Sequence, residues 1–106
     1  MKSLGETIRS LRETRGLLIR EVAAGLGIDP SLLSRIERGV KRPTRAQVVM
    51  LAKILGVDEH ELLVAYLSDK VVYELEGEEL ALKAMRVAEK RLTYSRARSR
   101  KSGKGK

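Results

Sequence analysis

Apolar residues recur along this chain at the spacing of α-helices, and the pattern centres on the stretch from Leu17 to Gly39. Two short apolar-periodic segments lie there on either side of Gly27, and the second begins with Asp29 and Pro30. An aspartate before a proline marks a helix start, because the carboxylate accepts a free backbone N–H and proline at the first helical position has none to lose. The stretch predicts a helix, a tight turn and a second helix that presents Ser and Arg outward.

Further helices are predicted on both sides of this stretch. In a capping box, the first residue and a Glu or Gln three positions later satisfy each other's free backbone donors. This pattern occurs at Ser3, Thr44 and Asp58, and Gly16 and Gly56 are placed to end helices. The five helices are expected to bury an apolar set made of Leu4, Ile8, Leu11, Ile19, Val22, Ala23, Leu26, Leu33, Ile36, Val48, Leu51, Ala52, Leu55, Leu62, Leu63, Tyr66 and Leu67.

The pattern changes after the fifth helix. Residues 68–77 fit either a helix or a strand, and helix is preferred because a lone strand would need a partner. Residues 78–94 predict another helix whose apolar stripe is wider than one contact needs, so part of it is expected to face a second subunit. Residues 95–106 are mainly Arg, Lys, Ser and Gly, which cannot bury enough apolar area to order themselves. We predict a flexible tail there.

The composition narrows the fold and the compartment. The 106 residues include three Tyr but no Phe, Trp or Cys. A core of Leu, Ile, Val, Ala and Met suits closely packed helices and predicts an all-α protein, while the lack of Cys removes disulfides and thiolate metal sites. No apolar run is long enough to cross a bilayer, and the N-terminus has no secretory core. We expect a cytoplasmic protein with no membrane association.

The formal net charge of +8 suggests a polyanionic partner, but its distribution matters more than its size. Residues 95–106 hold six basic residues and no acidic one, whereas residues 1–94 hold 16 basic and 14 acidic residues. The bulk charge is therefore weak support for a function, and the placement of individual Arg and Lys side chains has to carry the argument.

No group of residues suggests catalysis or metal binding. His60 is the only histidine and has no Cys or second His beside it to complete a metal site. Glu78 and Glu79 are adjacent, and adjacent side chains project from a helix in different directions, so they do not form an acid–base pair. We predict no metal, no cofactor, no small-molecule ligand and no enzymatic activity.

The capped helices around Leu17 to Gly39 resemble the helix-turn-helix of the Cro and phage-repressor family, also called the XRE family. The resemblance covers roughly residues 4–63 and implies a lambda-repressor-like bundle of five helices with an additional C-terminal helix. It divides the chain into a DNA-binding domain (residues 1–67), a helical extension (68–94) and a basic tail (95–106). The matching residues are Arg12, Gly16, Leu17, Glu21, Val22, Ala23, Leu26, Gly27, Pro30, Leu33, Ser34, Ile36, Glu37, Gly39, Pro43, Leu51, Ala52, Leu55, Gly56 and Val57.

The resemblance implies double-stranded DNA as the partner and the second motif helix as the reader of its major groove. By position, base readout falls to Ser31, Leu32 and Arg35, and the alternative for Arg35 is contact with phosphate or solvent. Ser34 and Arg38 fall at the margin of the base contacts or on phosphate. The other phosphate candidates, whose alternative is a solvated basic surface, are Arg20, Lys41, Arg42 and Arg45.

Four further positions bear on this assignment. In relatives, residues placed like Arg12 and Glu37 form an ion pair between the first and third helices, so we expect a structural pair here. The family often has Gln at the start of the second helix and a polar reader where this chain has Pro30, whereas Ile19 takes the first place. Both departures remove side-chain hydrogen bonds, so backbone N–H groups at that helix end are expected to take a larger share in holding phosphate.

Members of this family with one helix-turn-helix motif per chain usually bind palindromic operators as homodimers, because one recognition helix reads too few base pairs to select a site. Residues 64–94 resemble in length and position the C-terminal helices of restriction–modification controller proteins. The sequence thus predicts a dimeric, sequence-specific transcriptional regulator. The alternative is an antitoxin or a coactivator-like interaction module with the same fold. The tail fits either an electrostatic arm on DNA or a solubilising end.

Overall fold

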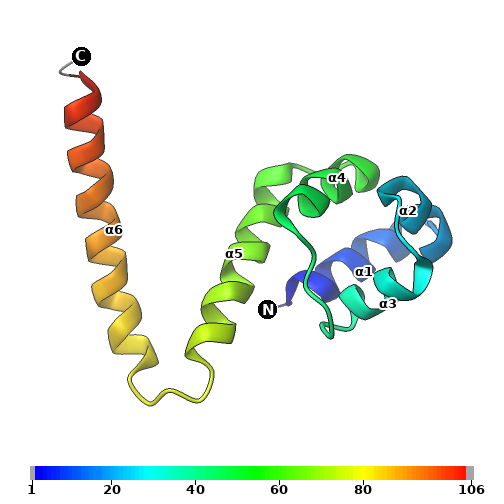
Figure 1. The fold of residues 1–106 in the computed structure, drawn as a ribbon, viewed down its shortest axis with the longest axis horizontal. Helices are drawn as coiled ribbons and strands as arrows, with labels where there is room; N and C mark the ends of the chain where they lie inside the picture. The colour runs from blue at the N-terminus through cyan, green and yellow to red at the C-terminus, as the bar shows by residue number, and fades with distance from the viewer. Residues whose placement is uncertain (1, 105–106) are drawn as a thin grey trace. The chain divides into compact units, whose positions relative to one another are not determined.

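The computed structural model describes the backbone of residues 2–104 and the side chains of residues 2–99. In this part of the chain the only regular secondary structure is α-helix, which confirms the all-α prediction (Figure 1). The chain divides into two compact units, Met1–Val72 (unit 1) and Tyr73–Lys106 (unit 2). The helices are α1 (Leu4–Thr14), α2 (Ile19–Leu26), α3 (Pro30–Glu37), α4 (Arg45–Leu55), α5 (Glu59–Leu75) and α6 (Ala81–Lys104).

The helix starts of unit 1 follow the capping signals with one exception. Ser3 with Glu6, and Thr44 with Gln47, form the predicted capping boxes before α1 and α4. Before α5, Asp58 Oδ1 instead accepts the backbone N–H of His60 at 2.8 Å. Aspartate side chains commonly accept the backbone N–H two residues on, and this bond still satisfies one free donor of the helix.

The tight turn between α2 and α3 forms as predicted at Gly27. This residue has a φ of +70°, in the left-handed region where glycine carries no penalty. The next N–H, that of Ile28, donates to Ala23 O at 3.0 Å and closes the end of α2. At the other end of α2, Leu18 has no capping side chain, and its backbone N–H donates to Glu21 Oε1 at 2.7 Å.

The core of unit 1 draws apolar side chains from all five of its helices. α2 packs against α3 and α4, and α1 packs against the same two helices. Most of the predicted inward residues are buried, and Leu11, Ile19, Leu26, Leu63 and Tyr66 lie partly buried around them. The buried set is Leu4, Ile8, Val22, Ala23, Leu33, Ile36, Val48, Leu51, Ala52, Leu55 and Leu62.

Two long-range contacts of α1 were not predicted. Gly5 lies so close to the end of α3 that a Cβ atom would stand 2.5 Å from Ile36 O and 2.6 Å from Glu37 O. The backbone N–H of Leu4, a free donor at the helix start, donates to Asp69 Oδ2 at 3.1 Å. The first and last helices of unit 1 are thus joined by a hydrogen bond across 65 positions of sequence.

Residues 68–77 resolve in favour of helix, because α5 runs without a break to Leu75. The prediction that Leu67 faces the core was wrong, since its side chain is 45% exposed. α5 continues past the part of unit 1 that its neighbours cover (Figure 1), and Tyr66 is the last of its apolar side chains that packs against the core. Val64 and Val71 are exposed as well.

The C-terminal helix also differs from the prediction at both ends. α6 begins at Ala81 instead of about residue 78, and it continues to Lys104, through most of the segment predicted to be a flexible tail. Residues 96–101 read Arg-Ala-Arg-Ser-Arg-Lys, and Arg, Ala and Lys are among the best helix formers. The segment has little apolar area to bury, but its local helix propensity is high. Residues 105–106 lie outside the described part.

Candidate nucleic-acid interface

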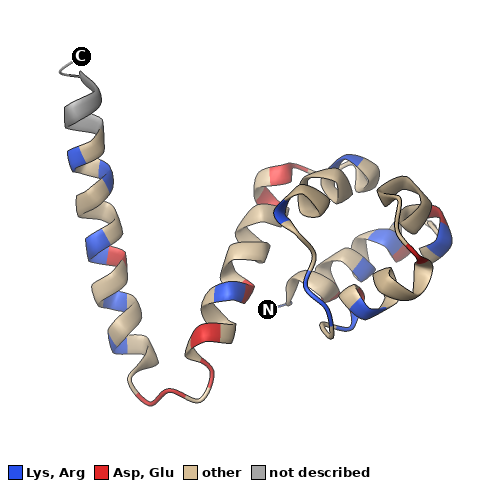
Figure 2. Cartoon of the chain, viewed as in Figure 1, with Lys and Arg blue, Asp and Glu red and all other residues tan. Residues whose placement is uncertain are grey.

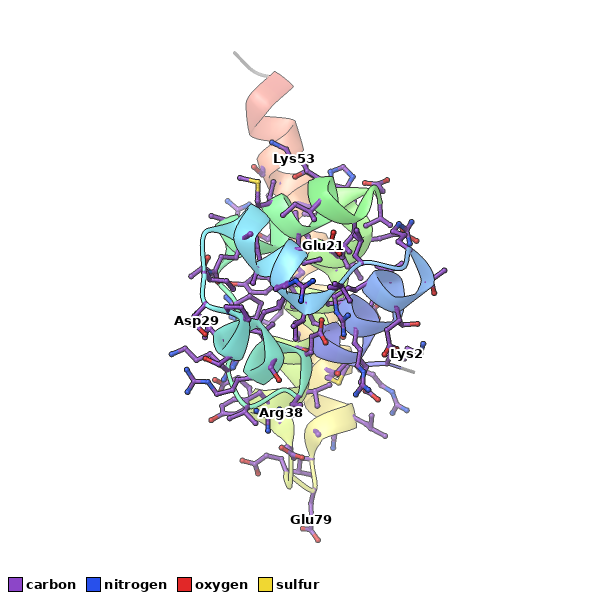
Figure 3. The ribbon with its side chains drawn as sticks, turned by 90° about the vertical axis from the view of Figure 1, so that its right-hand side faces the viewer. Lys2, Glu21, Asp29, Arg38, Lys53 and Glu79 are labelled. Carbon is purple, nitrogen blue, oxygen red and sulfur yellow. The ribbon has the colours of Figure 1, made fainter. Side chains whose placement is uncertain are left out.

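α3 is held with one face buried and the other open. Leu33 and Ile36 point into the core, whereas Ser31, Arg35 and Arg38 follow one another at spacings of four and three and are exposed. That spacing places the three side chains along a single helix face. Figure 3 looks onto this side of unit 1 and shows Asp29 at one end of α3 and Arg38 at the other.

The predicted ion pair between Arg12 and Glu37 is present and fixes the end of α3 to α1. Arg12 Nε donates to Glu37 Oε2 at 2.7 Å, and its Nη2 donates to Oε1 at 3.1 Å. The two side chains are only 13% and 4% exposed. The hydrogen bonds to Glu37 raise the pKa of Arg12 above its ordinary value, so the guanidinium stays charged. A two-point contact of this kind sets an angle as well as a distance.

Arg12 extends the same contact to the chain that leads into α2. Its Nη1 donates to Leu17 O at 2.9 Å. One side chain therefore links α1, the end of α3 and the approach to α2. Because Glu37 is turned inward by this link, its negative charge is kept off the exposed face of α3, where it would repel phosphate.

The start of α3 is closed by Asp29, and this changes the role open to Ser31. Asp29 Oδ1 accepts the backbone N–H of Ser31 at 2.8 Å and its hydroxyl at 2.7 Å. The hydrogen bonds from the hydroxyl and the N–H lower the pKa of Asp29. Ser31 was predicted to read bases, but its hydroxyl proton is already committed to the cap. Its oxygen retains lone pairs and is left as an acceptor.

Two other predicted contact residues are partly covered. Leu32 packs against the core of unit 1 and is half-buried, and Ser34 is half-buried too. Leu32 is next to the buried Leu33 in the sequence, and its side chain contacts the edge of the core. The exposed polar side chains here are therefore Ser31 and Arg35 of α3 and Arg38, which caps its C-terminal end.

The loop after α3 continues the positive charge of this face. Lys41, Arg42 and Arg45 are exposed, while Pro43 between them is buried and anchors the loop. The N–H groups of Val40 and Lys41 donate to Arg35 O at 2.9 and 3.3 Å, so the loop starts directly from the end of α3. Figure 2 shows this concentration of basic residues between α3 and α4.

We call the exposed residues Ser31, Arg35, Arg38, Lys41, Arg42 and Arg45 the α3 surface. Arg20, also predicted to contact phosphate, is exposed near the start of α2 and belongs to a different helix. Sequence analysis missed Val40, whose side chain is 67% exposed beside these cations. Its position directly before the basic loop was the only available signal. Val40 adds an exposed apolar side chain beside a surface that is otherwise polar and charged.

The other side chains of residues 2–99 form no candidate metal site. In the described part of the chain, no cluster of three or more His, Cys, Asp or Glu residues is placed to hold a metal ion. His60 is exposed and approaches Asp58 alone, at 4.0 Å. None of the described helices is long and apolar enough to span a membrane.

Comparison with known sequences agrees with this geometry. A family model described as a helix-turn-helix domain matches residues 3–64, more than half of the chain. The uncharacterized HTH-type transcriptional regulator y4dJ of Sinorhizobium fredii is 39% identical over 62 residues, which cover 58% of this chain and 80% of y4dJ. The HTH-type transcriptional regulator DdrOP3 of Deinococcus deserti is 37% identical over 60 residues, or 57% of this chain. That match spans 46% of DdrOP3, less than half of its length.

Two solved structures have a similar fold. The restriction-modification controller protein C.AhdI from Aeromonas hydrophila is 30% identical, with a TM-score of 0.53, over 56% of this chain and 89% of C.AhdI. A chain of the SinR protein/SinI protein complex is 25% identical, with a TM-score of 0.53, over 91% of this chain and 97% of the other. The family match covers α1 to α4, in which the predicted glycine turn, caps and Arg12–Glu37 pair are all present. The chain therefore belongs to the helix-turn-helix domain family, in its XRE type.

Proposed function

We propose that this chain is a sequence-specific, DNA-binding transcriptional regulator that lays α3 in the major groove of double-stranded DNA. The observation that carries the proposal is the α3 surface, in which exposed cations follow the open face of α3, its C-terminal end and the loop to α4, while the other face of α3 is buried. The major groove admits an α-helix and displays a distinct donor and acceptor pattern for each base pair. Relatives named as HTH-type transcriptional regulators support the regulatory role. As a transcriptional regulator, the protein is proposed to act in the cytoplasm and without catalysis.

Within the α3 surface, Arg35 is the main candidate for reading a base. It lies at the middle of the exposed face, and a guanidinium can donate two hydrogen bonds to the O6 and N7 atoms of guanine. Ser31 contributes an acceptor and Leu32 an apolar edge. Arg20, Ser34, Arg38, Lys41, Arg42 and Arg45 are proposed to contact phosphates, which positions the helix without reading sequence.

Selection of bound duplexes from a random DNA pool tests this proposal. A consensus that repeats after purification and re-binding is expected, and recovery of unselected sequences would contradict it. Arg35→Ala should then relax the preference at one base position by about 1–3 kcal/mol. Lys53→Ala removes a cation of α4 that lies outside the α3 surface (Figure 3), so it should leave the consensus unchanged.

We further propose that the regulator binds a palindromic operator as a homodimer, with residues 68–94 and the adjacent part of α5 forming the contact. Val64, Leu67 and Val71 recur at spacings of three and four, and all three are exposed. An apolar helix face of this kind is stabilised when a second copy covers it. Sedimentation should show a dimer, and Leu67→Asp should shift it to a monomer. A monomer that still binds a palindrome tightly would contradict the dimer.

The similarity to C.AhdI supports a narrower role. We propose that the chain controls its own promoter and a neighbouring restriction or modification gene. The regulatory test is binding to the DNA upstream of its own gene. A selected consensus that is absent from that DNA would contradict control of its own promoter while leaving sequence-specific binding intact.

The second candidate function is that of a protein-interaction module, such as an antitoxin or a coactivator-like adaptor. The observation that favours it is the similarity over 91% of this chain to a chain of the SinR protein/SinI protein complex. A module of this kind would bind its partner protein through the exposed apolar residues of α5 and α6. Failure to select any DNA, together with a stable complex formed with the product of a neighbouring gene, would favour this function.

A further inference from the structure

Charge is unevenly distributed along the chain. Residues 1–72 carry 12 basic and nine acidic residues, residues 73–80 carry four acidic and no basic residues, and residues 81–106 carry ten basic residues and one acidic residue. The acidic run spans the end of α5 and the connection to α6, and α6 holds nearly all of the basic run (Figure 2). The positive excess of the protein therefore belongs mainly to one helix, and it begins well before the terminal residues.

Opposite faces of α6 differ in chemistry. Lys83, Arg86 and Lys90 follow one another at spacings of three and four, which places them on one face of the helix. We call these three residues the basic face of α6. The opposite face is formed by small or flexible apolar residues at the same spacing, namely Ala81, Met85, Ala88 and Leu92.

The cations of the basic face have no partner within the described side chains. Among residues 2–99, no ion pair or hydrogen bond joins Lys83, Arg86 or Lys90 to a carboxylate. Glu89 is the only acidic residue of α6. The three side chains are exposed to solvent. Like charges at this spacing repel one another along a helix, so a polyanion that neutralises them would stabilise α6.

We propose that the basic face of α6 is a second DNA-binding surface, which contacts the phosphate backbone of the duplex independently of base sequence. The inference rests on the proposed function, since it adds a contact to the DNA that α3 reads. From Lys83 to Lys90 the helix rises by roughly 10 Å. Duplex DNA presents about one negative charge per 1.7 Å along its axis, so several phosphates fall within that length.

Two other polyanion or helix partners fit the same face less well. Binding in a lipid surface needs large apolar side chains that insert below the headgroups. Two of the four residues on the apolar face of α6 are alanine, and the protein has no Phe or Trp to insert. A second copy of the basic face would meet this one with like charge. Because α6 and α3 belong to one chain, the effective concentration of α6 is raised at any DNA that α3 binds.

The test compares full-length variants on two duplexes of equal length, the selected operator and a scrambled sequence. The triple variant Lys83→Gln, Arg86→Gln and Lys90→Gln should lose affinity for both duplexes by the same factor, roughly tenfold or more at low salt. The slope of log K against log salt should fall in magnitude by about 3 for each bound chain, since each phosphate contact contributes about 0.9. The ratio of operator to scrambled affinity should stay unchanged.

The matched control removes the same number of charges from exposed residues of unit 1 outside the α3 surface, as Lys2→Gln, Arg9→Gln and Lys53→Gln. An equal fall in slope for both triple variants would overturn the proposal, because net charge alone would explain it. An unchanged slope for the α6 variant would overturn it as well. The double variant Lys83→Arg and Lys90→Arg retains charge and should bind like the native chain, which separates loss of charge from loss of helix.

Two further measurements distinguish this proposal from the proposed role of Arg35 and from binding to lipid. If Arg35→Ala leaves the operator preference intact, the proposed role of Arg35 in base readout fails, while the slope on the scrambled duplex still tests α6. Vesicles of anionic phospholipid provide the lipid comparison. Tighter binding to these vesicles than to the scrambled duplex, lost in the α6 triple variant, would overturn the assignment to DNA.

Discussion

Unit 1 and unit 2 both present basic side chains, but they hold them in different ways. In unit 1, Arg35 and Arg38 stand on a helix fixed by buried Leu33 and Ile36 and by the ion pair from Arg12 to Glu37. In unit 2, the cations of α6 lie on a helix whose described side chains, residues 81–99, take no part in the buried core. Reading bases requires side chains placed to within a hydrogen-bond length, whereas neutralising phosphates does not. We therefore propose that unit 1 makes the sequence-specific contacts with bases and that unit 2 attracts DNA phosphates without regard to sequence.

The largest effect is expected from removing the ion pair that joins α3 to α1. Glu37→Gln leaves the Arg12 guanidinium unpaired in a largely buried place, so we expect unfolding to become easier by about 3 kcal/mol. Chemical denaturation of the single variants and of the Arg12→Met, Glu37→Met double variant measures the coupling. Glu13→Gln, which breaks the exposed pair with Arg9, should cost less than about 0.5 kcal/mol. Additive effects at positions 12 and 37 would show that the pair does not fix α3.

A second variant tests the close approach of α1 and α3. Gly5→Ala places a methyl group against two backbone carbonyls that cannot rotate away, so we expect a loss of about 1–3 kcal/mol in stability. Gly25→Ala is the control, because its methyl group would meet only the end of the flexible Ile54 side chain, at 2.9 Å. Thermal unfolding distinguishes the two. Equal effects would mean that the Gly5 contact does not limit the packing of α3.

A smaller effect is expected at the cap of α3. The pKa of Asp29 is lowered in the folded chain, so the stabilisation by its carboxylate is fully present above the ordinary value of 3.8. It is lost as the pH falls through the lowered folded-state pKa. Asp29→Asn keeps an accepting oxygen and should remove this pH dependence while retaining the cap. Melting curves of both proteins between pH 2 and pH 6 would show parallel profiles if the cap were unimportant.

The smallest effect should follow removal of α6. A chain ending at residue 80 keeps every buried core residue and Asp69, so the stability of unit 1 should change by less than about 0.5 kcal/mol. Denaturation at a fixed low protein concentration avoids any contribution from association. A loss of more than about 1 kcal/mol would mean that α6 supports the fold of unit 1, and the two units would then have to be treated as one.

Most of unit 1 could be predicted from the sequence because its signals are local. The capping boxes at Ser3 and Thr44, the cap at Asp29 and the left-handed turn at Gly27 each involve residues within a few positions of one another. Helical spacing likewise placed Arg35 on the open face of α3. The extension of α6 was missed because the absence of apolar surface was weighed above helix propensity.

The sequence by itself thus determined the helices, their order and the face of α3 that is open. The tertiary structure decided how α1 approaches α3 at Gly5, how Asp69 closes the start of α1, and how far Leu32 is covered. It also showed that Ser31 shares its hydroxyl proton with Asp29. Helix starts and turns depend on neighbours in the chain, whereas these contacts depend on distances between helices, which local propensity does not encode.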